Sequence, residues 1–304
     1  MVAWLVGRTL EVLDLVAGQD SGSLDDKVGL GPGERERWER IAHRLRVPFH
    51  ADGIISQFEG YEQLAEFDWE AYRTRYGDIG RLDLIAAAEG DSPNHYRLSK
   101  QADVLMLFYL FSAEELRELL ESMGYALPPD TIPRTVDFYL ARTSNGSTLS
   151  RLVHSWVLAR SDRHRSWSLF TQALDSDLGD IQGGTTREGV HLGAMAGTVD
   201  LILRCYAGLE IRDDVLRLHP SLPPELPHVA FDIVYRGQPI SVELTPDQVR
   251  LRLHPHSGVP ITVCIEDQLS VLSPGDEHVV ALAPQVPIGH SAHPTGRAPT
   301  NSVR

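Results

Sequence analysis

Apolar side chains recur at helical spacing from residue 1 to about residue 208. At the start of the chain they lie three and four residues apart, at Val2, Leu5, Val6, Leu10, Leu13 and Val16. This is the pattern of an amphipathic helix. The same spacing predicts helices around residues 34–46, 101–110, 113–123, 132–142, 149–160, 164–175 and 187–208. Ser112 followed by Glu115 forms a capping-box pattern, and Gly124 is a typical terminator of the helix between them.

After about residue 212 the hydrophobic period changes to the two-residue alternation of β-strands. The alternation predicts strands that include Val229–Tyr235, Ile240–Leu244, Val249–Leu253 and Ile261–Ile265. Short strands separated by turn residues are typical of an antiparallel β-sandwich. The pattern therefore divides the chain into a helical domain over residues 1–212, a β-sandwich over residues 213–285 and a disordered tail over residues 286–304.

Residues 47–99 form a long, aromatic-rich connection between predicted helices. The stretch is too long for a simple linker and too aromatic for a disordered one, so we expect structured loops, which often carry binding sites. Its aromatic residues, from Phe58 to Tyr76, could stack on sugars. Packing in the core is the interpretation that we favour for them, because aromatic side chains dominate core packing.

The charge and cysteine content narrow the classes of partner and environment. A formal net charge of -14 argues against nucleic acid, because binding a phosphate backbone requires a basic surface. Cys205 and Cys264 are the only cysteines, and they favour buried thiols in a reducing cytoplasm over a disulfide framework. No apolar run reaches the roughly 20 residues that span a bilayer, so we expect a cytoplasmic protein without membrane contact.

Two clusters of Gly, Ser and Thr precede predicted helices, at residues 144–150 and 182–189. Backbone amides at a helix N-terminus lack partners within the helix and favour an anion, so each cluster could bind phosphate. Most such clusters are only helix caps, and one alone is weak evidence. The presence of two, with His191 after the second, strengthens the case for an anion site.

Three segments together resemble glycoside hydrolase family 65, which includes maltose, trehalose and kojibiose phosphorylases and some acid trehalases. They are Phe49–Tyr61 (FHADGIISQFEGY), Lys100–Val104 (KQADV) and Gly183–Gly197 (GGTTREGVHLGAMAG). The segments occur in the family's order, and the similarity runs from about residue 1 to residue 285. The resemblance implies a mainly α fold with a β domain: a partial (α/α)6 barrel whose N-terminal helices are missing, followed by a small antiparallel β-sandwich.

The resemblance also implies roles for individual residues. Lys100 and Gln101 lie in the segment that binds the glucosyl unit of the substrate. The segments that hold inorganic phosphate contribute Ser147, Thr148, Thr185, Thr186 and His191. One departure is Asn145, where relatives often carry His. All of these residues would line one pocket for a glucosyl group beside a phosphate ion.

The implied reaction is phosphorolysis of a disaccharide α-glucoside to β-glucose 1-phosphate and a free sugar. An inverting hydrolase uses one carboxylic acid and a second carboxylate that activates water, whereas a phosphorylase uses phosphate as the nucleophile. The Ser, Thr, Gly and His segments therefore favour a phosphorylase over a trehalase-like hydrolase, for which Glu188 is the nearby acidic residue. A catalytically inactive carbohydrate-binding protein is the remaining alternative.

The general acid of the family lies in a segment upstream of the helix that begins this chain. No such segment occurs in residues 1–304, and the surroundings of Glu59 resemble a structural loop, so the catalytic residue stays unassigned. We therefore expect a truncated or split form of the enzyme, and we leave open a homodimer or association with a missing N-terminal half. His50, His154 and His191 match no metal-ligand spacing, and no nucleotide motif occurs. We expect no metal or organic cofactor, with inorganic phosphate as co-substrate.

Overall fold

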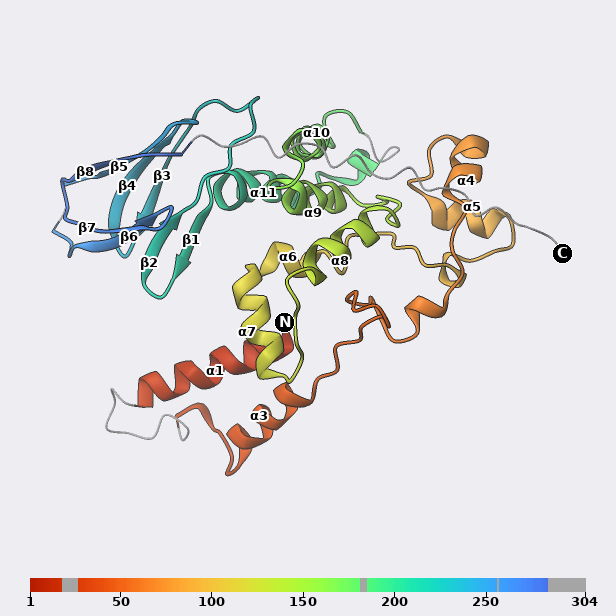
Figure 1. The fold of residues 1–304 in the computed structure, drawn as a ribbon, viewed down its shortest axis with the longest axis horizontal. Coiled ribbons are helices and arrows are strands. Elements are labelled where there is room, and N and C mark those ends of the chain that lie inside the picture. The colour runs from red at the N-terminus through yellow and green to blue at the C-terminus, as the bar shows by residue number, and fades with distance from the viewer. Residues whose placement is uncertain (18–26, 181–184, 256, 284–304) are drawn as a thin grey trace. The chain divides into compact units, whose positions relative to one another are not determined.

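The computed structural model describes residues 1–17, 27–180, 185–255 and 257–283. The chain forms two compact units, Met1–His154 and a second unit that begins at Ser155. Figure 1 shows the helices and strands of both. The expected tail over residues 286–304 and the Gln182–Gly184 part of the second Gly/Thr cluster lie outside the described residues.

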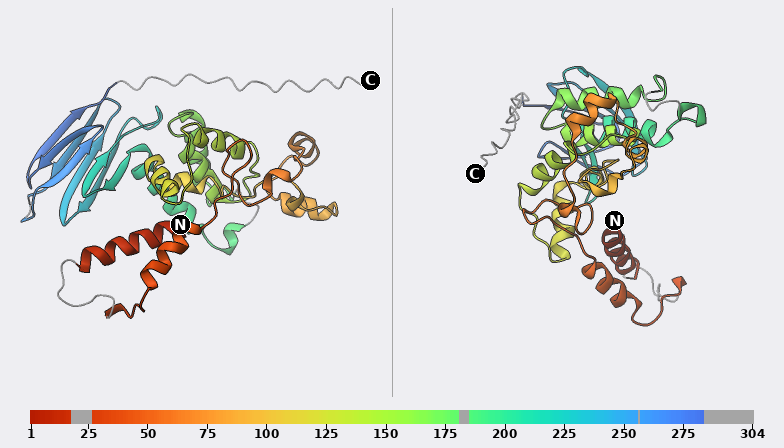
Figure 2. Two further views of the ribbon diagram at one scale, coloured as in Figure 1. Left: turned by 60° about the horizontal axis from the view of Figure 1, so that its bottom comes forward. Right: turned by 90° about the vertical axis from the view of Figure 1, so that its right-hand side faces the viewer.

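The first unit is helical. Its helices are α1 (Val2–Ala17), α3 (Glu34–Arg44), α4 (Trp69–Tyr76), α5 (Leu82–Ala88), α6 (Met106–Leu110), α7 (Ala113–Ser122), α8 (Thr131–Leu140) and the start of α9 (Thr148–Leu158), with 3-10 turns at Tyr61–Gln63 and Pro93–His95. Helices α1 and α3 pack against each other, as both views in Figure 2 show. The capping box before α7 is present, because the Ser112 hydroxyl accepts from the Glu115 amide and the Glu115 carboxylate accepts from the Ser112 amide.

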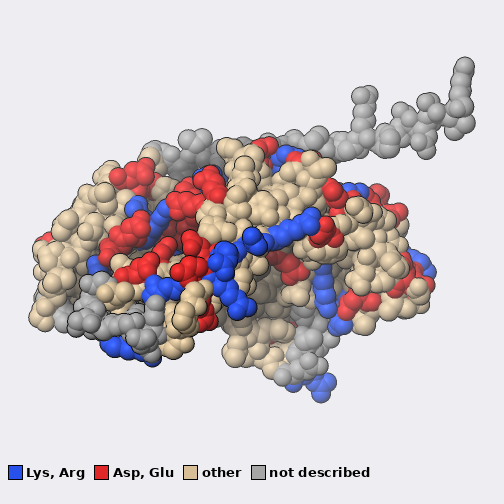
Figure 3. Space-filling view, turned by 90° about the horizontal axis from the view of Figure 1, so that it is seen from below, with Lys and Arg blue, Asp and Glu red and all other residues tan. Residues whose placement is uncertain are grey.

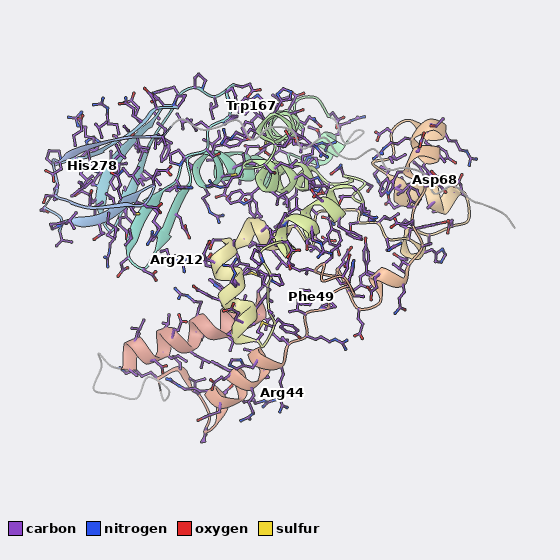
Figure 4. All side chains as sticks on the ribbon, in the orientation of Figure 1. Arg44, Phe49, Asp68, Trp167, Arg212 and His278 are labelled. Atoms are coloured by element: carbon purple, nitrogen blue, oxygen red, sulfur yellow. The ribbon has the colours of Figure 1, made fainter. Side chains whose placement is uncertain are left out.

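Two short helices lie in the connection of residues 47–99, where the sequence predicts only loops. The Asp68 side chain, labelled in Figure 4, begins α4 by accepting a hydrogen bond from the Ala71 amide at 3.0 Å. Helix α4 has only eight residues and none is fully buried, so its short aromatic stripe of Trp69, Tyr72 and Tyr76 gives a weak periodic signal. The predicted helix at 101–110 is shorter than expected and begins only at Met106.

The aromatic residues of this connection pack mainly into the core of the first unit. Phe67, Leu82 and Leu98 form a buried cluster, against which Trp69, Tyr72 and Tyr96 pack. Tyr61 is also buried and stacks against the ring of His50. Core packing therefore accounts for most of the aromatic side chains here.

The helices of the second unit are the end of α9, α10 (Arg163–Leu174) and α11 (Leu192–Asp200), with a 3-10 turn at Thr185–Glu188 and a π-helix at Leu201–Tyr206. Trp167, labelled in Figure 4, lies on α10, and its ring contacts those of Phe170 and Tyr206. The predicted helix over residues 187–208 is broken. It begins only at Leu192, after Gly189 with φ of 134°, and widens to a π-helix at its end.

The rest of the second unit is a β-sandwich of two four-stranded sheets. Its strands are β1 (Leu209–Arg212), β2 (Val215–Leu218), β3 (Val229–Tyr235), β4 (Gln238–Leu244), β5 (Gln248–Leu253), β6 (Ile261–Ile265), β7 (Gln268–Leu272) and β8 (Glu277–Ala281). The sheet orders are β1-β2-β6-β7 and β3-β4-β5-β8. Figure 1 labels the strands of both sheets. All neighbouring strands are antiparallel except β2 and β6, which pair in parallel. Helical domain and β-sandwich occur in the predicted order, so the predicted fold class is confirmed.

Other predictions concern the cysteines and the membrane. Cys205 and Cys264 are both buried free thiols. Within the described ranges, no helix has the length and hydrophobicity required to cross a membrane.

Candidate functional site

The Lys100 segment runs directly beside the Ser147 segment in the first unit. Ser99 and Thr143 form a parallel bridge, and the Ser144 amide donates to the Ser99 carbonyl oxygen at 2.9 Å. One residue further along the first segment and two further along the second, the Gly146 amide donates to the Lys100 carbonyl oxygen at 3.1 Å. The segment expected to bind the glucosyl unit is therefore held by backbone hydrogen bonds against one expected to bind phosphate.

Gly146 allows a third segment to approach closely. A Cβ atom at this position would lie 2.6 Å from the carbonyl oxygen of Gly80 and 3.2 Å from Cγ of Lys100. A contact of 2.6 Å is shorter than packing tolerates, so only glycine fits here without movement of its neighbours. The loop before α5, the Lys100 segment and the Ser147 segment therefore meet at Gly146.

Asp83 holds the side chain of Lys100. The Lys100 Nζ atom lies 3.4 Å from Asp83 Oδ2, and Arg81 Nε donates to the other carboxylate oxygen at 3.3 Å. Burial raises the pKa of Asp83, but the hydrogen bonds from Arg81 and Lys100 outweigh it and leave the pKa below its usual value. Lys100 is half exposed, so its ammonium group is both positioned and accessible.

The N-terminus of α9 carries the predicted phosphate residues of the first unit. Thr148 is the first residue of the helix and is buried, Ser147 precedes it and is partly exposed, and Gln101 is exposed on the neighbouring segment. Asn145 adopts a left-handed backbone with φ of 57°, and its Oδ1 atom is buried with no hydrogen-bond partner among the described residues. Asparagine tolerates this conformation better than most residues, so the departure at this position suits the turn.

The remaining predicted phosphate residues lie in the second unit. The Thr186 amide donates to Asp180 at 3.2 Å, and the Thr186 hydroxyl is buried with no partner among the described residues. Thr185 begins the short 3-10 turn that also includes Thr186. His191 precedes the first residue of α11, so its backbone lies at the N-terminus of that helix.

Asp177 binds His191 through two hydrogen bonds. Its Oδ1 atom lies 2.5 Å from the ring Nδ1 atom, and its Oδ2 atom accepts from the His191 amide at 2.9 Å. These bonds, the one from the ring first among them, lower the pKa of Asp177. A carboxylate that accepts from both the ring and the backbone amide holds the proton on Nδ1 and fixes the orientation of the imidazole.

Sequence reasoning missed Asp177, Asp180 and Asp83. Glu188 was the acidic residue considered near the second cluster, whereas the structure places Asp177 in direct contact with His191. The sequence feature that could have pointed to Asp177 and Asp180 is their position, three residues apart, just before the second Gly/Thr cluster. Sequence separation of 14 residues concealed their proximity to His191.

The other acidic and histidine candidates have local roles. Glu59 is exposed and pairs with Arg46 at 2.9 Å, which suits a surface loop better than a general acid. His50 is buried, and burial lowers its pKa. The described part of the chain holds no group of three or more His, Cys, Asp or Glu residues that could bind a metal ion.

Comparison with known proteins decides the family. Residues 1–200 match the glycosyl hydrolase family 65 central catalytic domain, and residues 209–272 match the C-terminal domain of that family. The chain belongs to glycosyl hydrolase family 65. The resemblance carried by the three sequence segments is thereby confirmed.

Individual relatives of this family 65 chain include phosphorylases. This chain is 52% identical over 263 residues to an uncharacterised glycosyl hydrolase of Mycobacterium tuberculosis (strain H37Rv). The match covers 86% of this chain and 20% of the relative. The chain is 36% identical over 217 residues to the trehalose 6-phosphate phosphorylase of Lactococcus lactis subsp. lactis, covering 71% of this chain and 28% of the relative.

A solved structure shares the fold. It is a human-microbiome protein provisionally named kojibiose phosphorylase, with a TM-score of 0.70, 18% sequence identity, and coverage of 92% of this chain and 39% of the other. The chain thus spans less than two fifths of the length of each of these proteins.

Proposed function

We propose that this family 65 chain carries the sugar- and phosphate-binding residues of an inverting α-glucoside phosphorylase. The observation that supports the proposal most directly is the pairing of the Lys100 segment with the N-terminus of α9 through the bond from the Gly146 amide to the Lys100 carbonyl oxygen. A glucosyl-binding group beside a helix N-terminus is what attack by phosphate on a sugar requires, because the nucleophile is then held next to the reacting carbon. The phosphorylase relative at 36% identity supports the same reaction class.

In the proposed reaction, Lys100 and Gln101 bind the glucosyl unit. Phosphate is held by Ser147, Thr148, Thr185, Thr186 and His191, and it attacks the anomeric carbon on the face opposite the leaving sugar. A carboxylic acid must protonate the leaving oxygen as the glycosidic bond breaks. We propose that this acid is supplied from outside residues 1–304, since Glu59 is engaged at the surface by Arg46.

The substrate class is a disaccharide α-glucoside. Trehalose, maltose and kojibiose are candidates from the family, and trehalose 6-phosphate joins them because of the Lactococcus relative. The proposed setting is the cytoplasm, where phosphate is available, and the chain is proposed to act as part of a longer or associated protein.

A trehalase-like hydrolase is the second candidate, and Asp177 is the observation that favours it. Asp177 supplies a carboxylate beside the second cluster that sequence reasoning had not considered. Its lowered pKa matches a carboxylate that stays ionised, but both of its oxygens accept hydrogen bonds from His191. A base that activates water needs an oxygen directed at that water. These contacts therefore favour a role for Asp177 in orienting His191 over a role as the base of a hydrolase.

The test is incubation of the purified protein with each disaccharide, with and without inorganic phosphate, followed by assay of β-glucose 1-phosphate and glucose. Phosphate-dependent β-glucose 1-phosphate from the protein in its native assembly is the expected result. Glucose release without phosphate would identify a hydrolase, and sugar binding without turnover would identify an inactive binding protein. Product from residues 1–304 alone would contradict the proposal that the acid lies elsewhere. Intact mass of the native protein and of any co-purifying chain tests the truncation.

A further inference from the structure

Arg151 lies in the first turn of α9, where no sequence motif assigned it a role. It follows Thr148 by three residues, so the two side chains lie on the same face of the helix. Its Nη1 atom is buried and has no hydrogen-bond partner among the described residues. A buried guanidinium nitrogen without an acceptor is costly, because removal from water is not offset by a new hydrogen bond.

The helix itself increases this cost. The N-terminus of a helix carries a partial positive charge, so a cation in the first turn is destabilising. Helix α9 has no acidic residue in its first turn that could neutralise Arg151. Burial lowers the pKa of the Arg151 guanidinium, and the charge of Asp78 only partly opposes this.

Partly buried arginines elsewhere in the first unit form ion pairs. Arg97 and Arg142 both bind Glu66, at 3.0 and 2.8 Å. Figure 3 shows the same tendency on the face that it draws, where Lys and Arg side chains are interspersed with Asp and Glu. Arg151 differs, since the described residues include no ion pair to it, and the carboxylate of Asp78 instead accepts from the Gly80 amide at 2.8 Å.

The surroundings of Arg151 belong to the candidate site. The carbonyl oxygen of Gly80 and the side chain of Lys100 both border Gly146, two residues before α9 begins. The hydroxyl of Ser150 is buried and lacks a hydrogen-bond partner among the described residues, and Ser150 itself is only 1% exposed. The start of α9 therefore brings together the Arg151 guanidinium, the buried Ser150 hydroxyl and the amides of the helix N-terminus. Lys100 lies on the neighbouring segment.

We propose that Arg151 is a phosphate ligand, binding a phosphate oxyanion at the N-terminus of α9. This deepens the proposed function, on which it rests for the identity of the anion. A phosphate group has several acceptor oxygens, so it can accept from the planar guanidinium and from helix amides together. A neutral sugar hydroxyl could satisfy the hydrogen bond but would leave the charge of Arg151 uncompensated. The phosphate could be inorganic phosphate or the ester group of a sugar phosphate.

The experiment measures binding of inorganic phosphate, trehalose and trehalose 6-phosphate by calorimetry, using the wild type and Arg151→Gln. Loss of a charge-assisted contact is expected to weaken phosphate binding roughly 10- to 100-fold. Weaker binding of inorganic phosphate by Arg151→Gln identifies inorganic phosphate, the proposed nucleophile, as the group that Arg151 binds. A loss confined to trehalose 6-phosphate, with trehalose unchanged, identifies the ester. Arg134→Gln is the matched control, because it removes the same charge from an exposed position on α8, where Arg134 pairs with Asp52, and it should bind every ligand like the wild type.

A second variant separates a ligand from a structural arginine. Arg151→Met keeps much of the side-chain volume and removes the buried charge, so the phosphate-free variant should unfold at the same temperature as the wild type or higher. Added phosphate should raise the unfolding temperature of the wild type and not that of the variant. A variant that is destabilised yet still stabilised by phosphate would overturn the proposal.

The outcomes distinguish this proposal from the proposed function. Phosphorolysis with an unchanged phosphate affinity in Arg151→Gln would remove Arg151 from the site and leave the function intact. Phosphate binding that depends on Arg151, in a protein that releases glucose without phosphate, would uphold the anion site and refute the phosphorylase.

Discussion

Asp177 and His191 are joined at both the ring and the backbone, with Oδ1 2.5 Å from the ring Nδ1 atom and Oδ2 2.9 Å from the amide nitrogen. The carboxyl group of Asp177 is almost fully buried, whereas the His191 side chain remains partly exposed. One carboxylate thus sets both the rotation of the imidazole and the backbone that leads into α11. If His191 binds phosphate as proposed, its side chain is already oriented and needs little further ordering.

The variant Asp177→Asn should weaken phosphate binding about tenfold, the effect of roughly one hydrogen bond, because asparagine has only one acceptor oxygen and cannot accept from both the ring and the amide of His191. Calorimetry with inorganic phosphate measures the change. Asp175→Asn is the matched control, since Asp175 is exposed two residues earlier and Asp177, not Asp175, makes the carboxylate bonds to His191 in the described structure. If His191→Ala lowers phosphate affinity and Asp177→Asn does not, His191 binds without the help of Asp177.

The variant Gly146→Ala should destabilise the protein by about 1–3 kcal/mol, the usual cost of forcing an extra methyl group into a packed position. The new Cβ would meet the Gly80 carbonyl oxygen at 2.6 Å, and backbone on both sides would have to move. Urea unfolding measures the change in the free energy of unfolding. The control Gly7→Ala lies in α1 with no atom within 4 Å of the new Cβ, so it should be neutral or stabilising by up to about 1 kcal/mol.

The variant Lys100→Met should separate binding from stability. The ion pair with Asp83 is half exposed, so its loss should change the free energy of unfolding by no more than about 1 kcal/mol. Glucosyl binding should weaken about tenfold or more, since a charged donor to the sugar is removed. Binding of glucose and of trehalose by calorimetry, beside urea unfolding, gives both quantities. Equal sugar affinity in the two proteins would remove Lys100 from the proposed site.

Asp91 provides a test of acid stability. A hydrogen bond from Tyr96, with others from His95 and the Ser92 amide, lowers the pKa of Asp91 to about 2. Because the folded pKa is below the unfolded value of about 3.9, Asp91 contributes stability above pH 4, which is lost as the pH falls toward 2. The difference in free energy of unfolding between the wild type and Asp91→Asn should therefore shrink across this range. A difference that stays constant from pH 5 to about 2 would contradict the assigned pKa.

The sequence predicts the fold well where burial is periodic. The helices beginning near Val2, Ala113 and Thr148 and the strands beginning at Val229 and Ile261 all occur as expected, because each buries one face. It fails for α4, which buries no residue, and for β1 and β2, whose four-residue strands are too short for alternation to stand out.

The candidate site was predictable only in part. Lys100 and Ser147 were selected by resemblance, and the structure shows their segments paired. Asp83 and Asp177 act through contacts across 17 and 14 residues of sequence, which no local pattern reveals. Arg151 has no motif at all, and only its burial without a partner distinguishes it.

The parallel pairing of β2 with β6 constrains the order in which the sandwich can assemble. Residues Val215–Leu218 align with Thr262–Ile265, so three further strands must be synthesised before β2 acquires this neighbour. The β3-β4-β5 meander pairs locally and can form first, whereas the other sheet has to close a long loop at an entropic cost that slows folding. Until then β2 presents an unpaired edge, which makes the nascent chain prone to intermolecular association during that interval.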